Sequence, residues 1–223
     1  MQHNIIAQPS YSLVEVTLEP GEELVSDSGA MAWMDTNVTT KTAARGGIMQ
    51  GLKRKFLSGE SFFQNTYTAE GGPGTVALAP GAAGDVVALE LDGELLMERG
   101  AYLGGGPGVK VDSKWGGLKG FFNEGLFVLR CHGKGTMFFG AYGDIQVVDL
   151  KDEEYVVDNG FAVAWEPQLS YRLSRARKIR SFLFSDQILL RFQGTGRIWV
   201  QTRSSQALAN FAHAFRSVKR RGN

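Results

Sequence analysis

The sequence contains one cysteine, three histidines and no long hydrophobic run. A single cysteine, Cys131, excludes an intramolecular disulfide and is typical of a chain from a reducing cytoplasm. No stretch approaches the roughly 20 apolar residues that a membrane-spanning helix needs. The N-terminal residues, MQHNIIAQPSYSL, lack both the basic region and the long apolar region of a signal peptide. We therefore expect a cytoplasmic protein with no signal peptide, transit peptide or transmembrane segment.

Residues that commonly build catalytic and metal centres are also scarce. His3, His132 and His213 lie too far apart to act as paired zinc ligands on one element. The sequence has no nucleophile elbow, no phosphate-binding loop and no dinucleotide-binding fingerprint. Cys131 and His132 are adjacent, but neighbours on a strand point to opposite faces, so we expect a buried thiol and a solvent-side imidazole. We predict no catalytic residues, no cofactor and no metal site.

Neither sign of charge dominates. The chain has 24 Lys and Arg against 23 Asp and Glu, a formal net charge of +1, so no long-range attraction to nucleic acid or an anionic membrane is expected. Its 223 residues, 43% of them hydrophobic, can bury a substantial core. We expect residues 1–223 to form one domain.

A short stretch of sequence occurs three times in diverged form. It reads EELVSDSGAMAW around Gly29, GELLMERGAYLG around Gly100 and EEYVVDNGFAVAW around Gly160. A second signature follows each copy, reading GPGTVALA, GKGTMFFG and GTGRIWVQ around Gly74, Gly135 and Gly196. The two signatures are 45, 35 and 36 residues apart, and a surface loop can absorb the longer first spacing. We predict three pseudo-repeats at about 14–86, 87–145 and 146–203.

Alternation at a period of two predicts strands inside these units. Val14, Val16 and Leu18 alternate with polar residues, and later apolar runs such as ILLRF and RIWVQ suit more deeply buried strands. Turn signals, including Asp92-Gly93 and the Gly-x-Gly of the second signatures, are expected to separate strands. We therefore predict an all-β fold, a double-stranded β-helix or prism-like domain with three internal pseudo-repeats.

Each anchor glycine of the first signature follows a carboxylate by two residues. We interpret this pattern as a bulge or tight turn in which the glycine takes a positive φ. The carboxylates Asp27, Glu98 and Asp158 are expected to lie on exposed strand faces, and the alternative of an acidic ring that binds a metal is not favoured.

The C-terminal segment changes to helical spacing, with apolar residues at Leu208, Phe211, Phe215 and Val218. We predict an α-helix at about 204–220, with Ser204 or Ser205 as N-cap and basic residues that complement the dipole at its end. Its apolar face is expected to dock on the domain, and His213 to lie at the surface or its boundary.

Each unit also carries a connection that is both basic and apolar. The segments GLKRKFLSGESFF, GLKGFFNEGLF and the arginine-rich stretch before SFLFSDQILL occupy equivalent places. Such segments suit contact with another subunit, a lipid headgroup layer or a nucleic acid, and a loop folded on its own core is the open alternative. The candidate interaction surface comprises Leu52, Lys53, Arg54, Lys55, Phe56, Trp115, Leu118, Lys119, Arg175, Arg177 and Lys178.

Three long stretches together resemble a known family. They are EPGEELVSDSGAMAWMD, GLKRKFLSGESFFQNTYTAEGGPGTVALAPGAAGDVVAL and EGLFVLRCHGKGTMFFGAYGDI. The chain is similar, over nearly its whole length, to the altered-inheritance-of-mitochondria family. The resemblance implies a tryptophan-RNA-binding-attenuation-protein-like fold, of the double-stranded β-helix class, an oligomeric state, and in eukaryotic members an association with inner-membrane organisation in mitochondria. It implies no catalytic residues.

Three functions follow as hypotheses. The favoured one is a non-enzymatic scaffold, a homo-oligomer that contacts partner proteins or a membrane surface. A nucleic-acid-binding protein that uses its basic clusters is the second, and it predicts salt-dependent binding of RNA or DNA. An enzyme of unknown type is the third, and it requires a pocket with converging polar groups.

Overall fold

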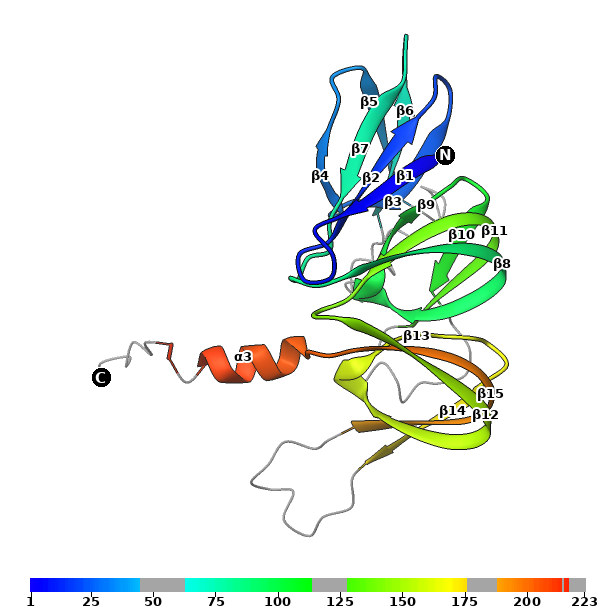
Figure 1. Cartoon of the computed structure of the whole chain (residues 1–223), viewed down its shortest axis with the longest axis vertical. Helices are drawn as coiled ribbons and strands as arrows, with labels where there is room; N and C mark the ends of the chain where they lie inside the picture. The colour runs from blue at the N-terminus through cyan, green and yellow to red at the C-terminus, as the bar shows by residue number, and fades with distance from the viewer. Residues whose placement is uncertain (45–62, 114–127, 176–187, 214, 217–223) are drawn as a thin grey trace.

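The computed structural model describes residues 1–44, 63–113, 128–175, 188–213, 215 and 216. Strands dominate these residues, and one helix lies near the C-terminus, so the predicted all-β class with a C-terminal helix is confirmed. The strands form three groups that lie one after another along the longest axis of the molecule (Figure 1). The double-stranded β-helix assignment and the division of the chain into domains stay predictions.

The three groups contain the following elements. The first group holds β1 (Gln2–Ile6), β2 (Leu13–Leu18), β3 (Glu23–Asp27), β4 (Met31–Met34), β5 (Val38–Ala44), β6 (Phe63–Ala69) and β7 (Gly74–Leu78). The second holds β8 (Val86–Glu98), the 3₁₀ turn η1 (Arg99–Ala101), β9 (Tyr102–Gly105), β10 (Val109–Ser113) and β11 (Val128–Gly140). The third holds β12 (Ile145–Asp158), the 3₁₀ turn η2 (Asn159–Phe161), β13 (Ala162–Trp165), β14 (Ser170–Arg175) and β15 (Ile188–Gln201), followed by helix α3 (Ser205–His213).

A long antiparallel pair forms the centre of the second and third groups. β8 pairs with β11 along its whole length, and β12 pairs with β15 with one register shift. In the first group, β2 pairs with β7 and β3 pairs with β6, so two shorter pairs occupy this place. The alternation predicted for the first of these strands is confirmed, since Val14, Val16 and Leu18 are buried and the residues between them are not.

Two turn predictions were wrong in the second and third groups. Asp92-Gly93 does not separate two strands, because β8 runs through it and Gly93 stays opposite Gly133 of β11. The Gly-x-Gly signatures likewise lie inside β11 and β15. Their glycines take positive φ values, +117° at Gly133 and +142° at Gly135, which lets a continuous strand bend without the steric cost that a side chain would carry.

The anchor glycines of the first signature also differ from expectation. Gly29, Gly100 and Gly160 do not take a positive φ. Space explains the glycine at two of them. A Cβ on Gly160 would lie 2.7 Å from Ser204 Oγ, and one on Gly100 would lie 3.0 Å from Glu98 Oε2. An added side chain at either position would therefore have to displace the Ser204 hydroxyl or the Glu98 carboxylate, whereas the backbone conformation is one that other residues adopt.

Three short strands, β4, β9 and β13, take the same place in their groups. Each pairs antiparallel with the strand that carries the second signature, which is β7, β11 or β15, and each pairing contains one register shift. β9 also pairs with β3 of the preceding group, and β13 with β8 of the preceding group. These pairings join the groups into an 11-stranded sheet beside a four-stranded one. Common descent of the groups from one repeated unit stays a prediction.

Three apolar clusters form the core, and each of them contains residues of two neighbouring groups, as Leu96 of β8 shows for the cluster centred on the third group. One centres on the first group but includes Leu103 and Phe138 of the second. A second joins Met137 and Phe139 of the second group to Trp199 of the third, whose ring meets that of Phe139 edge to face at 6.1 Å. Burial of these large side chains stabilises each group against its neighbour.

Candidate interaction surfaces

The predicted contact residues fall almost entirely outside the described part of the chain. Segments 45–62, 114–127 and 176–187 contain Leu52, Lys53, Arg54, Lys55, Phe56, Trp115, Leu118, Lys119, Arg177 and Lys178. Arg175 ends β14, and its backbone pairs with Ile188, but its side chain is not described. Each segment connects two antiparallel partners, which are β5 and β6, β10 and β11, or β14 and β15. The contact role of these residues stays a prediction.

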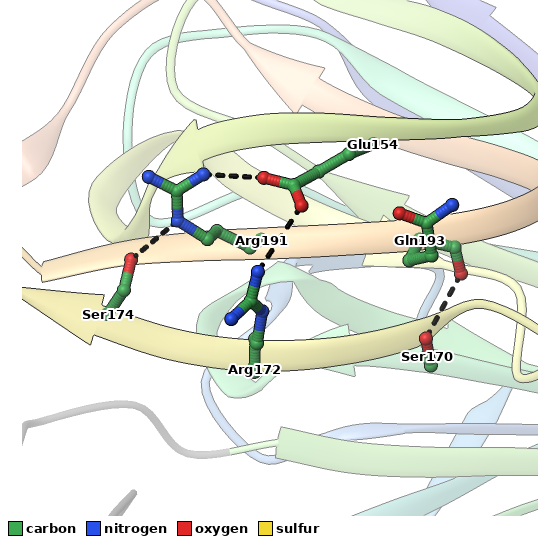
Figure 2. A network of polar contacts seen from close by, with 6 residues as sticks. All are labelled: Glu154, Ser170, Arg172, Ser174, Arg191 and Gln193. Carbon is green, nitrogen blue, oxygen red and sulfur yellow. Dashed lines mark hydrogen bonds and ion pairs between the residues drawn. The ribbon is translucent and has the colours of Figure 1, made fainter.

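Part of the predicted basic cluster is engaged within the third group. Arg172 and Arg191, on neighbouring strands, both reach the carboxylate of Glu154 on β12 (Figure 2). Arg191 also donates through Nε to the Ser174 hydroxyl, at 3.0 Å. The hydrogen bond from Arg191, together with that from Arg172, holds the pKa of the Glu154 carboxyl below its usual range. Arg172, which belongs to the basic stretch expected to be available for phosphates, therefore already has an acidic partner, and it shares that partner with Arg191, which lies outside the predicted stretch.

The adjacent pair Cys131 and His132 is divided as predicted. Cys131 is buried in the core of the second group, while the partly exposed His132 places Nε2 2.8 Å from Asp112 Oδ2. The thiol and the imidazole therefore lie on opposite faces of β11. This geometry offers no thiolate and imidazolium pair for nucleophilic catalysis.

The carboxylates of the first signature cap the turns that follow them. Glu98 Oε2 accepts a hydrogen bond from Gly100 N at 2.8 Å, and Asp158 Oδ1 accepts one from Gly160 N at 3.0 Å. Burial raises the pKa of Glu98, and burial also raises the pKa of Asp27, against the lowering effect of backbone hydrogen bonds. Among the residues that the structure describes, no three His, Cys, Asp or Glu side chains gather around a possible metal position. These carboxylates have a structural role in the turns.

A cavity of about 330 Å³ lies where the second group meets the third group and the start of α3. Its walls include Glu98, Tyr142 and Gln201. Glu98 is committed to its turn, and Gln201 accepts from Tyr142 N and donates to Gly160 O, each at 2.8 Å. The polar groups around this cavity therefore hold neighbouring turns together, and those described do not converge on one point as a catalytic site requires.

Helix α3 departs from the prediction that it docks on the domain. The N-cap is Ser204, whose Oγ accepts from Ala207 N at 3.4 Å, as the sequence predicts. The helix ends at His213, earlier than predicted, and it extends away from the strand groups (Figure 1). Leu208, Phe211 and Phe215 are 50, 67 and 75% exposed. The docking prediction was wrong, because helical spacing identifies an apolar face but not what covers it.

Two end strands carry a further apolar surface that the sequence reasoning missed. All four residues of β4 are exposed, including Met31, Trp33 and Met34, and on β12 the exposed apolar residues include Tyr155 and Val156. β4 closes the four-stranded sheet, and β12 closes the 11-stranded sheet. The predicted threefold repeat could have indicated these surfaces. In a series of similar units, the first and the last unit each lack one neighbour, so their outer strands are expected to be exposed.

No helix among the described residues is long and apolar enough to cross a bilayer. A short helix with an exposed apolar face and basic residues near one end is typical of elements that lie in the interface between lipid and water.

The chain is similar to a known family and to proteins of known structure. Residues 3–203 match the family model described as mitochondrial biogenesis AIM24, which confirms the resemblance stated from the sequence. An uncharacterized protein of Streptococcus pyogenes serotype M6 is 30% identical over 220 residues, covering 94% of this chain and 88% of that protein. The crystal structure of a Streptococcus pyogenes protein is similar with a TM-score of 0.80 and 27% identity, covering 96% of this chain and 99% of that chain.

Proposed function

This chain belongs to the mitochondrial biogenesis AIM24 family, and we propose that it is a non-enzymatic interaction protein that binds an anionic membrane surface through α3. The observation that carries the proposal is the exposure of Leu208 and Phe211 on a helix that extends away from the body of the molecule (Figure 1), with Phe215 exposed two residues beyond the end of that helix. Large apolar side chains held in water on one helix face favour transfer into an apolar or interfacial environment.

Charge supports an anionic partner. Residues 204–223 contain four of the 24 Lys and Arg and none of the 23 Asp and Glu. The other 203 residues therefore carry 20 basic and 23 acidic side chains, a formal charge of −3. The segment that begins with α3 is thus the basic end of a slightly acidic molecule, and anionic lipid headgroups complement that end.

The expected affinity is modest for one copy. Full burial of a Leu or Phe side chain contributes about 1.5–3 kcal/mol, and each Lys or Arg near an anionic surface contributes about 1 kcal/mol. Part of this is lost in ordering the bound helix. One α3 therefore supports reversible binding at the surface, and several copies held together would bind much more tightly.

Sedimentation with lipid vesicles tests the proposal. The full chain is mixed with vesicles of phosphatidylcholine alone or of phosphatidylcholine with phosphatidylglycerol. We expect binding to the anionic vesicles, weakened at high salt, and at least a tenfold loss of binding in the double variant Leu208→Ser/Phe211→Ser. Folding stability should change by no more than about 0.5 kcal/mol, since both side chains are exposed.

Tyr11→Ser provides the matched control, because Tyr11 is as exposed as Phe215 but lies in the first group. This variant should bind vesicles like the wild type. The proposal is overturned if the wild type does not bind anionic vesicles, or if the double variant binds them as the wild type does.

Two predictions from the sequence are tested beside this proposal, the first of them in the same vesicle assay. The triple variant Lys53→Glu/Arg54→Glu/Lys55→Glu tests the predicted contact segment. The segment contributes to membrane binding only if this variant also binds fewer vesicles than the wild type.

Nucleic-acid binding is tested by a low-salt mobility shift. The pairing of Arg172 and Arg191 with Glu154 disfavours it, and salt-dependent RNA or DNA binding with no vesicle binding would replace the membrane proposal.

A further inference from the structure

We infer that copies of this chain assemble head to tail, with β4 of one copy pairing antiparallel with the end of β12, at Val156 and Val157, in the next. The partner is a second copy of the same chain. The inference rests on strand register and burial, and it is independent of membrane binding by α3.

The chain already contains this kind of junction twice. In the first junction, β9 pairs with β3 through Gly104↔Ser26 and Gly105↔Val25. In the second, β13 pairs with β8 through Ala164↔Met97 and Trp165↔Leu96.

Both junctions have one register when residues are counted from the anchor glycines Gly29, Gly100 and Gly160. The residue four after the glycine of the later group faces the residue three before the glycine of the earlier group. In the same way, the residue five after the glycine of the later group faces the residue four before the glycine of the earlier group. The junction is therefore a recurring structural unit, with the side chains around it as the variable part.

One half of such a junction is left open at each end of the molecule. Within the described residues, β4 pairs only with β7, and β12 pairs only with β15. Figure 1 shows the first group, with β4, and the third group, with β12, at opposite ends of the longest axis. A chain cannot join its own two ends in this arrangement, so the missing neighbour is another copy.

Applying the internal register to the two ends gives a specific pairing. Trp33 should face Val157 of the next copy, and Met34 should face Val156. Three of these four side chains are exposed, with Trp33, Met34 and Val156 exposed by 46, 37 and 42%, whereas Val157 is already buried in the core of the third group. Their counterparts in the internal junction of the second and third groups are fully buried, as Ala164, Trp165, Leu96 and Met97 show. The exposed residues therefore mark positions where a neighbour is missing.

Side-chain size is consistent with the same register. Gly104 must be small, because a Cβ there would lie 2.8 Å from Leu78 Cδ1. Leu78 lies four residues after Gly74, the glycine of its second signature. The equivalent residue of the third group, four residues after Gly196, is the smaller Val200. In the first group, the residue equivalent to Gly104 is the larger Trp33. In the proposed assembly Trp33 would lie against the smaller, half-buried Val200 of the next copy.

The polar surroundings also allow strand pairing. β4 reads MAWM and carries none of the lysines, prolines or charges that usually protect an edge strand. Next to Tyr155 on β12, Glu154 is held by Arg172 and Arg191 (Figure 2), so it brings no unbalanced negative charge to the junction. Because different surfaces meet in each contact, assembly is heterologous and gives a closed ring or an open filament.

Substitutions that place a charge on either open edge test the assembly. We expect the full-length wild type to form multimers in sedimentation velocity, and Met34→Lys and Val156→Lys to sediment as monomers. Val147→Lys is the matched control, because Val147 is an exposed residue on the first half of the same strand, outside the predicted junction. Leu208→Ser/Phe211→Ser should also assemble normally, which separates this inference from membrane binding.

A cysteine pair tests the register without charging the edge. Residues directly opposite in antiparallel strands have Cβ atoms about 4.5–5.5 Å apart, close enough for a disulfide after small shifts. Met34→Cys/Val156→Cys should give covalent multimers on mild oxidation, whereas Met34→Cys/Val147→Cys should not. The native Cys131 is fully buried and should not interfere. A monomeric wild type, multimers in both charged variants, or equal cross-linking of the two cysteine pairs would overturn the inference.

Discussion

β4 and β13 have the same place in their groups and consist only of apolar residues, but they have opposite surroundings. β13 reads AVAW and is buried along its whole length, while β4 reads MAWM and is exposed along its whole length. The difference is a neighbour, since β13 pairs with β8 of the preceding group and β4 has no preceding group. Burial in this molecule thus depends on position in the series of groups as much as on the hydrophobicity of the strand.

The largest expected contrast is between the two tryptophans of these strands. Trp165 is fully buried and meets Tyr171 and Phe192 with ring centroids 5.1 and 5.5 Å away. Trp165→Ala should lower the free energy of unfolding by about 3–5 kcal/mol. Trp33→Ala should lower it by less than about 1 kcal/mol in dilute, monomeric protein. Urea denaturation of both variants measures the difference, and equal losses would show that β4 is as well packed as β13.

The second comparison is between two glycines at the internal junction, Gly104 of β9 and Gly106 just after it. Gly104→Ala should destabilise the fold by about 1–3 kcal/mol, because the added methyl group meets Leu78 and the Val25 carbonyl oxygen at under 3.0 Å. Gly106→Ala is the control, since a Cβ there would make only an ordinary contact, 3.6 Å from Met1 Cε. Chemical denaturation should separate the two variants. If both are equally stable, the close approach of β9 to the first group is not a constraint on residue 104.

The smallest effect concerns the carboxyl at the end of β8. Burial raises the pKa of Glu98 above its unfolded value, so ionisation of this group costs stability as the pH rises through the folded-state pKa. Glu98→Gln keeps an acceptor for Gly100 N and removes that cost. We expect the variant to be more stable than the wild type at neutral pH, by up to about 1 kcal/mol, and the difference to vanish at acidic pH, where Glu98 is protonated. Thermal unfolding across pH measures this, and a constant difference would exclude the titration of Glu98 as its cause.

The sequence predicted the parts of the fold that depend on local pattern. Alternation at Val14, Val16 and Leu18 identified a strand with the correct buried face, and Ser204 was correctly named as a possible N-cap. Asp92-Gly93 was misassigned as a turn between strands, because a glycine with positive φ also permits a bend inside a long paired strand. Local residue type does not distinguish these two outcomes.

The candidate surfaces were harder to predict, because exposure depends on distant parts of the chain. Phe211 has the spacing of a docked helix and is nevertheless exposed, since no strand group lies against that face of α3. Trp33 belongs to a stretch whose third copy is buried, and only the strand order shows that the first copy lacks a neighbour. The hydrophobic pattern of a segment identifies an apolar surface. Whether another part of the molecule covers that surface depends on how the strand groups are arranged.

Mixing the two edge variants tests whether β4 of one copy binds β12 of another. Met34→Lys retains an intact β12 edge, and Val156→Lys retains an intact β4 edge, so an equimolar mixture can form one good junction and no more. Native mass spectrometry should show each variant alone as a monomer and the mixture as a dimer containing one copy of each, with nothing larger. A mixture that stays monomeric, or that forms higher multimers, would contradict head-to-tail assembly through β4 and β12.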